Sequence, residues 1–233
     1  MQDLERYESK YLLNFKEALL IQKRLEQYIK PDKYSEGTGY RVRSIYFDTI
    51  FNRDFYMREE SASHRRHIRI RTYPDAMDTI SLELKEKNGV TIRQRILPVT
   101  RRMTQEMLSG DFRCLKQHKD PFGRMLYREM TLETYRPVVM IEYQRKAYAR
   151  EENNTRITFD SCIRSKEGNL DLFDPQPFLA PVGHQGEVIM ELKYTDFFMS
   201  DLKSAVGTRL LRQEAAGKYQ RSRMISMSGR NIL

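Results

Sequence analysis

The sequence lacks the features that mark several classes of protein. Its 233 residues include no Trp and only two Cys, Cys114 and Cys162. These two residues form neither a Cys-x-x-Cys pair nor a zinc-type spacing, so we expect free thiols in a reducing compartment. The four His show no ligand spacing, and His64 and His67 lie among arginines, which disfavours a metal cation there. The composition therefore excludes a disulfide framework and a zinc finger.

Long hydrophobic runs are absent as well. No segment approaches the roughly 18 apolar residues of a membrane-spanning helix, and the N-terminus has no apolar core of a secretory signal. A glycine-rich phosphate loop is also missing, because Gly37-Thr38-Gly39 is not followed by Lys-Ser/Thr and a helix. No Ser-His-Asp or Cys-His nucleophile can be identified by spacing. We therefore expect a cytoplasmic protein without a membrane segment.

Positive charge is in excess. The chain has 41 Lys and Arg against 32 Asp and Glu, which gives a formal net charge of +9. A basic balance of this size points to an anionic partner, which can be nucleic acid, a membrane surface or a phosphorylated substrate.

The clearest pattern is the strict alternation of apolar and cationic residues at residues 67–73. Successive side chains of a strand point to opposite faces, so Ile68 and Ile70 share one face while Arg69 and Arg71 share the other. A single strand of this kind is typical of a one-sided antiparallel sheet with a solvated face.

The same charged face returns in five further segments. They carry Glu8 and Lys10, Glu83 and Lys85, Arg93 and Arg95, Arg156 with Thr158 and Asp160, and Glu191 and Lys193. Six strands with one repeated charged face predict a sheet curled into a barrel of about eight strands with that face inward. A lumen dominated by basic groups suits a linear polyanion, and its carboxylates suit a divalent metal. Because buried charges are costly unless paired, Glu–Lys partners also have a structural reason to lie there.

Strands interrupted by helices, without regular βαβ alternation, indicate the α+β class. We therefore predict one domain over residues 1–233, an antiparallel barrel with flanking helices. Asn88-Gly89 predicts a tight hairpin. We also expect separate strands at 138–144 and 148–150, a helix over 201–212 and another over 218–227.

The charged strands stand in an order that resembles a known family. The ordered motifs are Arg6-Tyr7-Glu8-Ser9-Lys10-Tyr11, Ser44-Ile45-Tyr46-Phe47-Asp48-Thr49, Ile68-Arg69-Ile70-Arg71-Thr72-Tyr73, Leu82-Glu83-Leu84-Lys85, Ile141-Glu142-Tyr143-Gln144-Arg145, Arg156-Ile157-Thr158-Phe159-Asp160 and Met190-Glu191-Leu192-Lys193-Tyr194. Over roughly Arg6 to Arg223 the chain resembles the VTC domain, the polyphosphate polymerase branch of the triphosphate tunnel metalloenzymes. The resemblance implies a tunnel-shaped barrel that binds ATP, a phosphate chain and a divalent metal, Mn²⁺ or Mg²⁺.

The resemblance also implies roles for individual residues. Glu191 corresponds to the metal ligand, whereas Glu8 and Glu83 stay open between metal ligation and neutralising nearby lysines. Gly217, before Lys218-Tyr219, stands where the family usually has Ser, so one hydroxyl for phosphate is missing. The basic residues matched to phosphate binding are Lys10, Arg69, Arg71, Lys85, Arg145 and Arg156, with Arg93 or Arg95, Tyr143, Lys193 and Lys218 as further substrate-binding residues.

Three functions remain open from the sequence. The favoured one is a phosphotransferase that moves the γ-phosphate of ATP onto a growing inorganic polyphosphate. The alternatives are hydrolysis of tripolyphosphate or a nucleoside triphosphate, and a polyanion-binding module without catalysis. Nucleic acid is disfavoured because the aromatic residues form no stacking platform interleaved with the basic strands. The regulatory and membrane parts that accompany this domain in the fungal complex are missing from the chain, so a membrane-protein partner remains unknown.

Overall fold

A computed structural model describes residues 4–35, 37–60, 64–89, 91–214 and 217–230. Within these ranges, no helix is both long and apolar enough to span a membrane.

Eight strands form a closed antiparallel barrel, which confirms the predicted fold class. The order around the barrel is β6-β2-β3-β4-β5-β1-β9-β7, and a pairing between β7 and β6 closes it. A short ninth strand, β8 (Ala180–Pro181), adds to the edge of β7. The barrel strands are β1 (Leu4–Asn14), β2 (Tyr40–Thr49), β3 (His64–Tyr73), β4 (Ala76–Asn88), β5 (Thr91–Pro98), β6 (Tyr135–Arg150), β7 (Thr155–Lys166) and β9 (Glu187–Tyr194).

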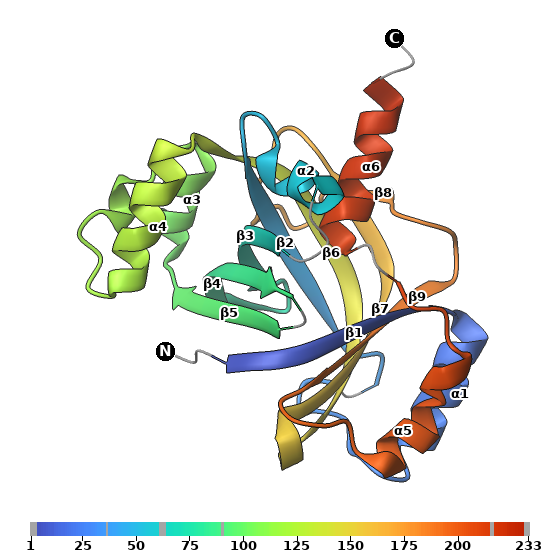
Figure 1. Ribbon diagram of the computed structural model, residues 1–233. Coiled ribbons are helices and arrows are strands. Elements are labelled where there is room, and N and C mark those ends of the chain that lie inside the picture. The colour runs from blue at the N-terminus through green and yellow to red at the C-terminus, as the bar shows by residue number, and fades with distance from the viewer. Residues whose placement is uncertain (1–3, 36, 61–63, 90, 215–216, 231–233) are drawn as a thin grey trace.

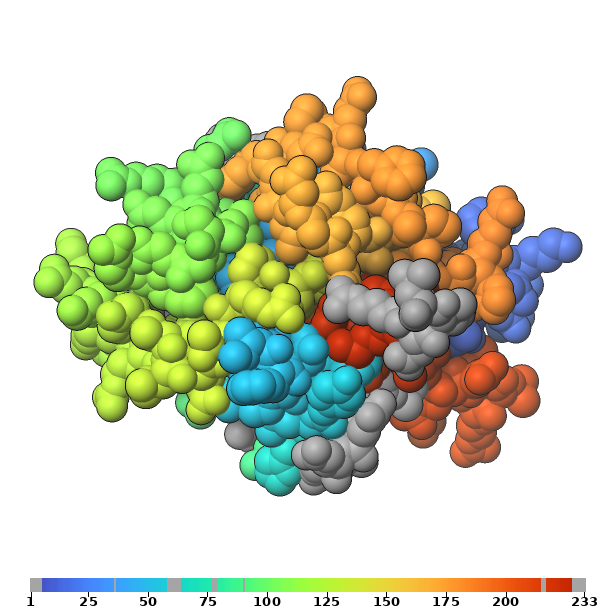
Figure 2. Space-filling model, turned by 90° about the horizontal axis from the view of Figure 1, so that it is seen from above, coloured from blue at the N-terminus to red at the C-terminus, as the bar shows by residue number. Residues whose placement is uncertain are grey.

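Helices cover the barrel on two sides and at one end (Figure 1). The pair α3 and α4 lies on one side, α1 and α5 lie together on another, and α2 and α6 meet over one end. Figure 2 looks down on that end and shows α2 (cyan) next to α6 (red). The helices are α1 (Phe15–Leu25), α2 (Arg53–Glu60), α3 (Arg101–Leu108), α4 (Pro121–Leu132), α5 (Ser200–Val206) and α6 (Lys218–Arg230), with single 3₁₀ turns at Arg113–Leu115, Glu152–Asn154 and Thr208–Leu210.

Local sequence explains where several helices begin. Asn14 caps α1 in a capping box with Glu17, and Thr100 accepts a hydrogen bond from the N–H of Met103 at the start of α3. Asp120 caps α4, which has Pro121 in its first turn. These caps place the helices directly after barrel strands or tight loops.

Two of the three hydrophobic clusters lie outside the barrel, between its strands and the helices, whereas the third, with Ile141 of β6 and Ile189 of β9, lies on inward strand faces. Ile70 and Leu82 on the outer face of β3 and β4 pack into one apolar cluster with Leu126 of α4. On the other side, Met190 of β9 shares a second cluster with Leu25 of α1. Because side chains alternate along a strand, burying the apolar residues outward turns the charged residues of the same strands into the lumen.

Two predicted elements differ from the structure. The strands expected at 138–144 and 148–150 are one strand of 16 residues, because residues 135–145 of β6 pair with β2 and the overlapping residues 140–150 pair with β7. The helix expected over 201–212 ends at Val206. Gly207 adopts a left-handed conformation, with φ of 66°, and its N–H caps the helix on the carbonyl of Lys203.

Candidate polyanion tunnel

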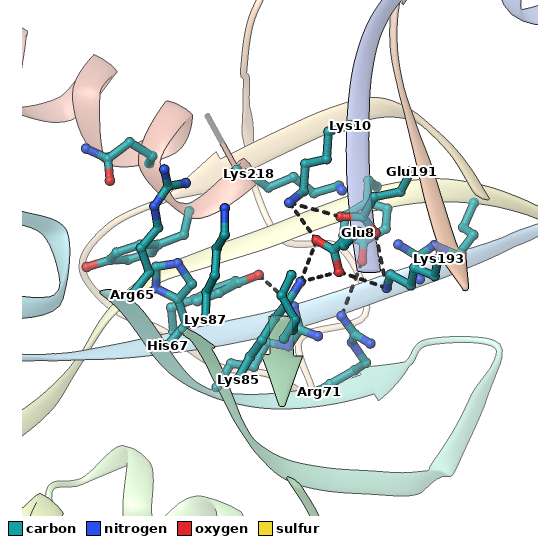
Figure 3. A pocket seen from close by; sticks show the side chains of 18 residues that line it. Glu8, Lys10, Arg65, His67, Arg71, Lys85, Lys87, Glu191, Lys193 and Lys218 are labelled. Carbon is teal, nitrogen blue, oxygen red and sulfur yellow. Dashed lines mark hydrogen bonds and ion pairs between the residues drawn. The ribbon is translucent and has the colours of Figure 1, made fainter. Parts of the chain in front are cut away.

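The lumen next to α6 collects cations from many strands. Among the residues that the structure describes, nine Lys and Arg side chains and two Glu side chains line this cavity, and Figure 3 shows them converging from several elements. The cations are Lys10, Arg65, Arg69, Arg71, Lys85, Lys87, Arg145, Lys193 and Lys218, and the acids are Glu8 and Glu191.

Strand register explains why these side chains meet. Residues directly opposite each other in an antiparallel ladder point to the same face. Lys10 of β1 lies opposite Glu191 of β9, and two residues earlier Glu8 lies opposite Lys193. Residues far apart in the sequence therefore become neighbours inside the barrel.

Glu8, Lys10, Lys85, Glu191 and Lys193 form one partly buried group, which we call the lysine–glutamate cluster. The Lys10 ammonium lies 2.6 Å from Glu8 and 3.6 Å from Glu191. Lys85 lies 2.7 Å from a carboxylate oxygen of Glu8, and Lys193 lies 3.2 Å from Glu191. The two carboxylates thus hold the three lysines in place.

The lysines keep both carboxylates of this cluster ionised. Burial alone would raise the pKa of Glu191, but Lys193 and Lys10 outweigh it and hold that pKa well below its usual range. Burial and the charge of Glu191 oppose ionisation of Glu8 too, yet Lys85 and Lys10 lower its pKa. For Lys10, burial is outweighed by the two glutamates, which raise its pKa. Both glutamates are therefore weak bases.

The guanidinium groups of Arg69 and Arg71, both on β3, differ in the length of their hydrogen bonds to the protein. Arg69 donates to Glu83 at 2.7 and 2.9 Å and to the Tyr46 hydroxyl at 2.9 Å. With the part of the chain that the structure describes, Arg71 makes only long contacts, at 3.4 Å to Ser44, 3.5 Å to Tyr143 and 3.6 Å to Glu83. Arg71 therefore has more donor capacity left for an anion than Arg69.

Glu83 is a charge partner within this arrangement. Burial would raise its pKa, but Arg69 and Arg71 lower it to about 2. Its oxygens also accept hydrogen bonds from Ser81 and Gln94. Both oxygens of Glu83 therefore have protein donors.

The first turn of α6 closes this end of the lumen. Lys218 lies 2.5 Å from Asp160 and its ammonium sits 4.7 Å from the centre of the Tyr143 ring. Tyr219 stacks on Tyr46 at 5.2 Å and donates to Asp48. Gly217 lines the cavity just before the helix, so the electropositive N-terminus of α6 also faces the lumen.

Arg145 and Arg156 continue the charge away from α6. Arg145 forms a bidentate pair with Asp160, with both distances 2.7 Å. Arg156 lies opposite Lys193 in the ladder but reaches the other opening of the barrel, where it donates to Asp32 at 2.5 Å and to the Tyr40 hydroxyl at 3.0 Å. Cationic side chains thus extend through the barrel from one opening to the other.

Arg93 and Arg95 lie outside the lumen. The prediction that they share the inward charged face is therefore wrong. Gln94 faces inward and donates to Glu83, and Ile92 lines the cavity. Arg95 points outward, where its guanidinium lies 4.6 Å from the centre of the Phe122 ring of α4 and 3.2 Å from Glu86. Arg93 is exposed on the same outer face.

Several lining residues were not predicted as site residues. Arg65 and His67 extend the inward row of Arg69 and Arg71, and Lys87 extends the row of Glu83 and Lys85. The same alternation would have found them if it had been followed four residues back from Arg69 and two residues on from Lys85. Burial and the charge of Lys85 lower the pKa of His67 to about 3, so His67 faces the lumen as a neutral ring.

The residues around Glu191 fit a divalent metal that phosphate oxygens help to bind. Glu191 and Glu8 share Lys10 and Lys193 as partners, and both are ionised oxygen donors. The Oγ1 atom of Thr158, opposite Glu191 in the ladder, is buried without a hydrogen-bond partner among the described residues. No group of three or more His, Cys, Asp or Glu side chains in the described ranges is arranged to hold a metal alone. This donor set matches Mg²⁺-type sites, in which one or two carboxylates act together with substrate phosphates.

Comparison with known proteins agrees with this geometry. The model of the VTC domain matches residues 5–225. The chain belongs to the VTC domain family. No curated protein matches the sequence.

Solved structures share the fold of this VTC domain at low identity. A protein from Hippeastrum, described as a putative adenylyl cyclase with a dominant triphosphatase activity, has 15% identity and a TM-score of 0.53, with 93% of this chain and 91% of that chain covered. A protein from Vibrio parahaemolyticus, also described as a putative adenylate cyclase, has 12% identity and a TM-score of 0.53, with 94% of this chain and 98% of that chain covered. A Bacillus halodurans protein of the same description has 13% identity and a TM-score of 0.51, with 90% and 88% covered. These proteins share the tunnel-shaped barrel.

Proposed function

We propose that this VTC domain is a metal-dependent polyphosphate polymerase that transfers the γ-phosphate of ATP to an inorganic polyphosphate chain. The observation that supports it best is the convergence of nine cationic side chains on one lumen. Arginine gives planar, bidentate phosphate contacts and lysine gives point charges, so the set suits a row of phosphate groups. Family membership supports the same substrates.

The transfer would proceed in line within the tunnel. A terminal oxygen of the polyphosphate forms a bond to the γ-phosphorus, and the bond from that phosphorus to the β–γ bridging oxygen breaks. ADP leaves with the electron pair, and the polymer grows by one phosphate. The attacking oxygen is already anionic, so no general base is needed. Catalysis then rests on positioning and charge stabilisation.

Individual residues take distinct parts in this proposal. Arg71, Lys85 and Lys218 would bind phosphate oxygens, and Arg145 and Arg156 would hold phosphates nearer the opening opposite α6. A divalent metal held by Glu191, with Glu8 beside it, would offset charge on phosphate oxygens. Arg69 and Glu83 would act as a paired scaffold that keeps Arg71 in the lumen. Phosphate binding would draw the lysines of the cluster away from their carboxylates.

Hydrolysis is the second candidate, because the Hippeastrum protein of the same fold is described as a triphosphatase. Water must lose a proton to attack phosphorus efficiently. Glu8 and Glu191, the carboxylates of the lumen, are already paired with Lys10, Lys85 and Lys193. This property favours an acceptor that is already anionic, such as polyphosphate.

One experiment separates these functions. The purified chain is incubated with γ-labelled ATP and Mn²⁺ or Mg²⁺, and products are sized on a gel. We expect ADP and a ladder of labelled polyphosphate. Arg71→Ala should abolish the ladder, whereas Arg95→Ala, a matched arginine outside the lumen, should leave it intact. Release of labelled orthophosphate alone would indicate a hydrolase, and tripolyphosphate binding without turnover would indicate a binding module.

A further inference from the structure

We propose that His67 is a further phosphate-binding residue of the tunnel, neutral beside the cations of the lumen and protonated beside bound phosphate. This inference rests on the proposed function and adds a proton to the binding step. The protein would take up one proton from the solvent when a triphosphate or a polyphosphate chain binds, and the charged ring would donate to a phosphate oxygen.

The backbone of β3 turns His67 into the same lumen as the arginines of that strand. His67 stands two residues after Arg65 and two before Arg69, so the three side chains share one face, and all of them line the cavity. Across the ladder His67 lies opposite Lys85 of β4. Figure 3 shows His67 in the row of side chains that border the cavity. It therefore occupies a position at which its neighbours on the same face are cations.

Two tyrosine rings pack against the imidazole. The ring centre of His67 lies 5.0 Å from that of Tyr219 on α6 and 6.2 Å from that of Tyr46 on β2. The Nδ1 atom of His67 is buried and has no hydrogen-bond partner among the described residues. Buried polar atoms normally have a partner, so the described residues leave the hydrogen bonding of this ring incomplete. A phosphate oxygen in the lumen would supply an acceptor for a protonated ring, in which both nitrogen atoms are donors.

Cations dominate the electrostatic surroundings of His67. The four charges that act on it most strongly are all positive, and together with burial they lower the pKa of the ring to about 3. These charges are Lys85 of β4, Arg69 and Arg65 of β3, and Lys10 of β1. The groups that face His67 from β2 and α6 are the two tyrosine rings. The ring is thus neutral because of its place in the cluster of cations.

The carboxylates on this side of the lumen are engaged by other residues. Glu8 of β1 pairs with two lysines of the lysine–glutamate cluster. Asp48 of β2 accepts a hydrogen bond from Tyr219, and Asp54 of α2 accepts one from another tyrosine. None of these three carboxylates is left to balance a positive charge on His67, so the counterion has to come from a ligand.

A bound phosphate chain reverses this balance. It brings several negative charges into the lumen, and an opposite charge close to a histidine favours its protonated form. The same charges offset the cations that act on the ring. Arg65 and Arg69 are charged with or without phosphate, whereas the charge of His67 follows the binding of phosphate. Because the pKa of His67 is then higher in the complex, its contribution to affinity is present below that pKa and is lost as the pH rises through it.

NMR spectroscopy of the histidine rings tests the charge of His67 directly. The nitrogen resonances of an imidazole distinguish its neutral from its protonated form, and comparison with His67→Gln identifies the signals of His67. At pH 6 we expect a neutral ring in the wild-type protein alone and a protonated ring with saturating tripolyphosphate. His184, an exposed histidine that does not line the cavity, is the internal control and should show no change on binding. A His67 ring that stays neutral in the complex at pH 6 would overturn the inference and leave the proposed function standing.

Calorimetric titration with tripolyphosphate, without metal, measures the proton and its effect on affinity. In two buffers of different ionisation enthalpy at pH 6, the wild type should take up about one proton more than His67→Gln. Binding by His67→Gln should be about 10-fold weaker than that of the wild type at pH 6 and nearly equal at pH 8. His184→Gln should match the wild type at both pH values. Equal proton uptake by the wild type and His67→Gln also overturns the inference. If the wild type binds no tripolyphosphate, the proposed function itself is wrong.

Discussion

Arg43 and Arg71 show how differently the two faces of this barrel use a buried arginine. Arg43 lies on the outer face of β2 and is 1% exposed. It donates to Glu142 at 2.8 Å and to the carbonyl oxygens of Leu172 and Asp174, so it ties the segment after β7 to the barrel. Arg71 lies on the inner face of β3, is 8% exposed, and has no hydrogen bond or ion pair shorter than 3.4 Å among the described residues.

The difference in hydrogen bonding indicates that Arg43 stabilises the fold, whereas Arg71 is free to bind a ligand. Outside the barrel, a buried cation is saturated by protein acceptors, because the surrounding core is apolar and leaves no other partner. Inside the barrel, the cation stands among other cations with donor capacity left. Burial alone therefore does not distinguish Arg43 from Arg71, whereas the hydrogen bonds around the two guanidinium groups do.

The largest expected effects come from replacing Arg43 and Arg71 by alanine in two separate variants. Arg43→Ala leaves Glu142 buried with Arg164 alone, and we expect a loss of about 3–5 kcal/mol in the free energy of unfolding. Arg71→Ala should change that free energy by less than about 1 kcal/mol, because its contacts are long, yet abolish tripolyphosphate binding. Urea denaturation and calorimetric titration measure the two properties. Similar destabilisation by both substitutions would contradict the distinction.

Two buried carboxylates extend the comparison to pH. The pKa of Glu83, in the lumen, is about 2, so its contribution is present above its unfolded pKa and is lost as the pH falls through about 2. For Asp54, in the first turn of α2, burial and the charge of Asp48 raise the pKa to about 7. The stability that protonated Asp54 provides is therefore lost as the pH rises from about 4 to 7.

Asp54→Asn should remove this loss. We expect the variant to be less sensitive to pH between 4 and 7 than the wild type, by roughly 3–4 kcal/mol over the window. Urea denaturation at a series of pH values measures it. Asp111→Asn, at an exposed carboxylate, should leave the profile over this window unchanged. A wild-type profile that is flat from pH 4 to 7 would show that Asp54 is ionised throughout.

Glu191→Gln should affect turnover more than binding. The substitution removes a charged oxygen ligand, so transfer from ATP should fall by about 100-fold or more. Tripolyphosphate without metal should bind as well or more tightly, because a negative charge leaves the lumen. Glu86→Gln, on the outer face beside Arg95, is the matched control. Normal turnover by Glu191→Gln with Mn²⁺ would reduce Glu191 to a charge partner of Lys193 and Lys10.

The smallest effect concerns Gly217, at the entrance of α6. A Cβ atom added there meets nothing within 4 Å, so Ser fits without displacing a neighbour. Its hydroxyl would face the lumen beside Lys218, and one more hydrogen bond to phosphate is worth about 1 kcal/mol. We expect Gly217→Ser to tighten tripolyphosphate binding about 5-fold in calorimetry. Gly217→Ala should show no gain, and a gain with Ala as well would point to helix stabilisation instead of a hydroxyl.

The sequence by itself determined that a charged face repeats from strand to strand. Period-two alternation assigns residues such as Arg69 and Arg71, or Glu83 and Lys85, to a common face without any knowledge of the fold. The number of such strands, together with the ordered motifs, was enough to predict a closed barrel with flanking helices. It also brought Lys10, Arg145 and Glu191 into one set before their neighbours were known.

Only the tertiary structure decided which face of each strand looks inward and which strands adjoin. Arg93 and Arg95 obey the alternation as well as Arg69 and Arg71 do, but β5 turns Gln94 inward because Arg95 packs on Phe122 outside the barrel. Alternation sorts side chains into two faces, and the packing partners then choose the face that is buried under helices.

Contacts between distant segments could not be predicted from the sequence either, because they depend on how the strands pack together. Lys218 reaches Asp160 from the first turn of α6, and Tyr34, Tyr40 and Tyr73 meet at the opposite opening although the sequence shows no aromatic platform. Each of these contacts depends on barrel closure, since the pairing of β6 with β7 brings both ends of the sheet together. Closure is a property of the whole set of strand registers, and no single strand encodes it.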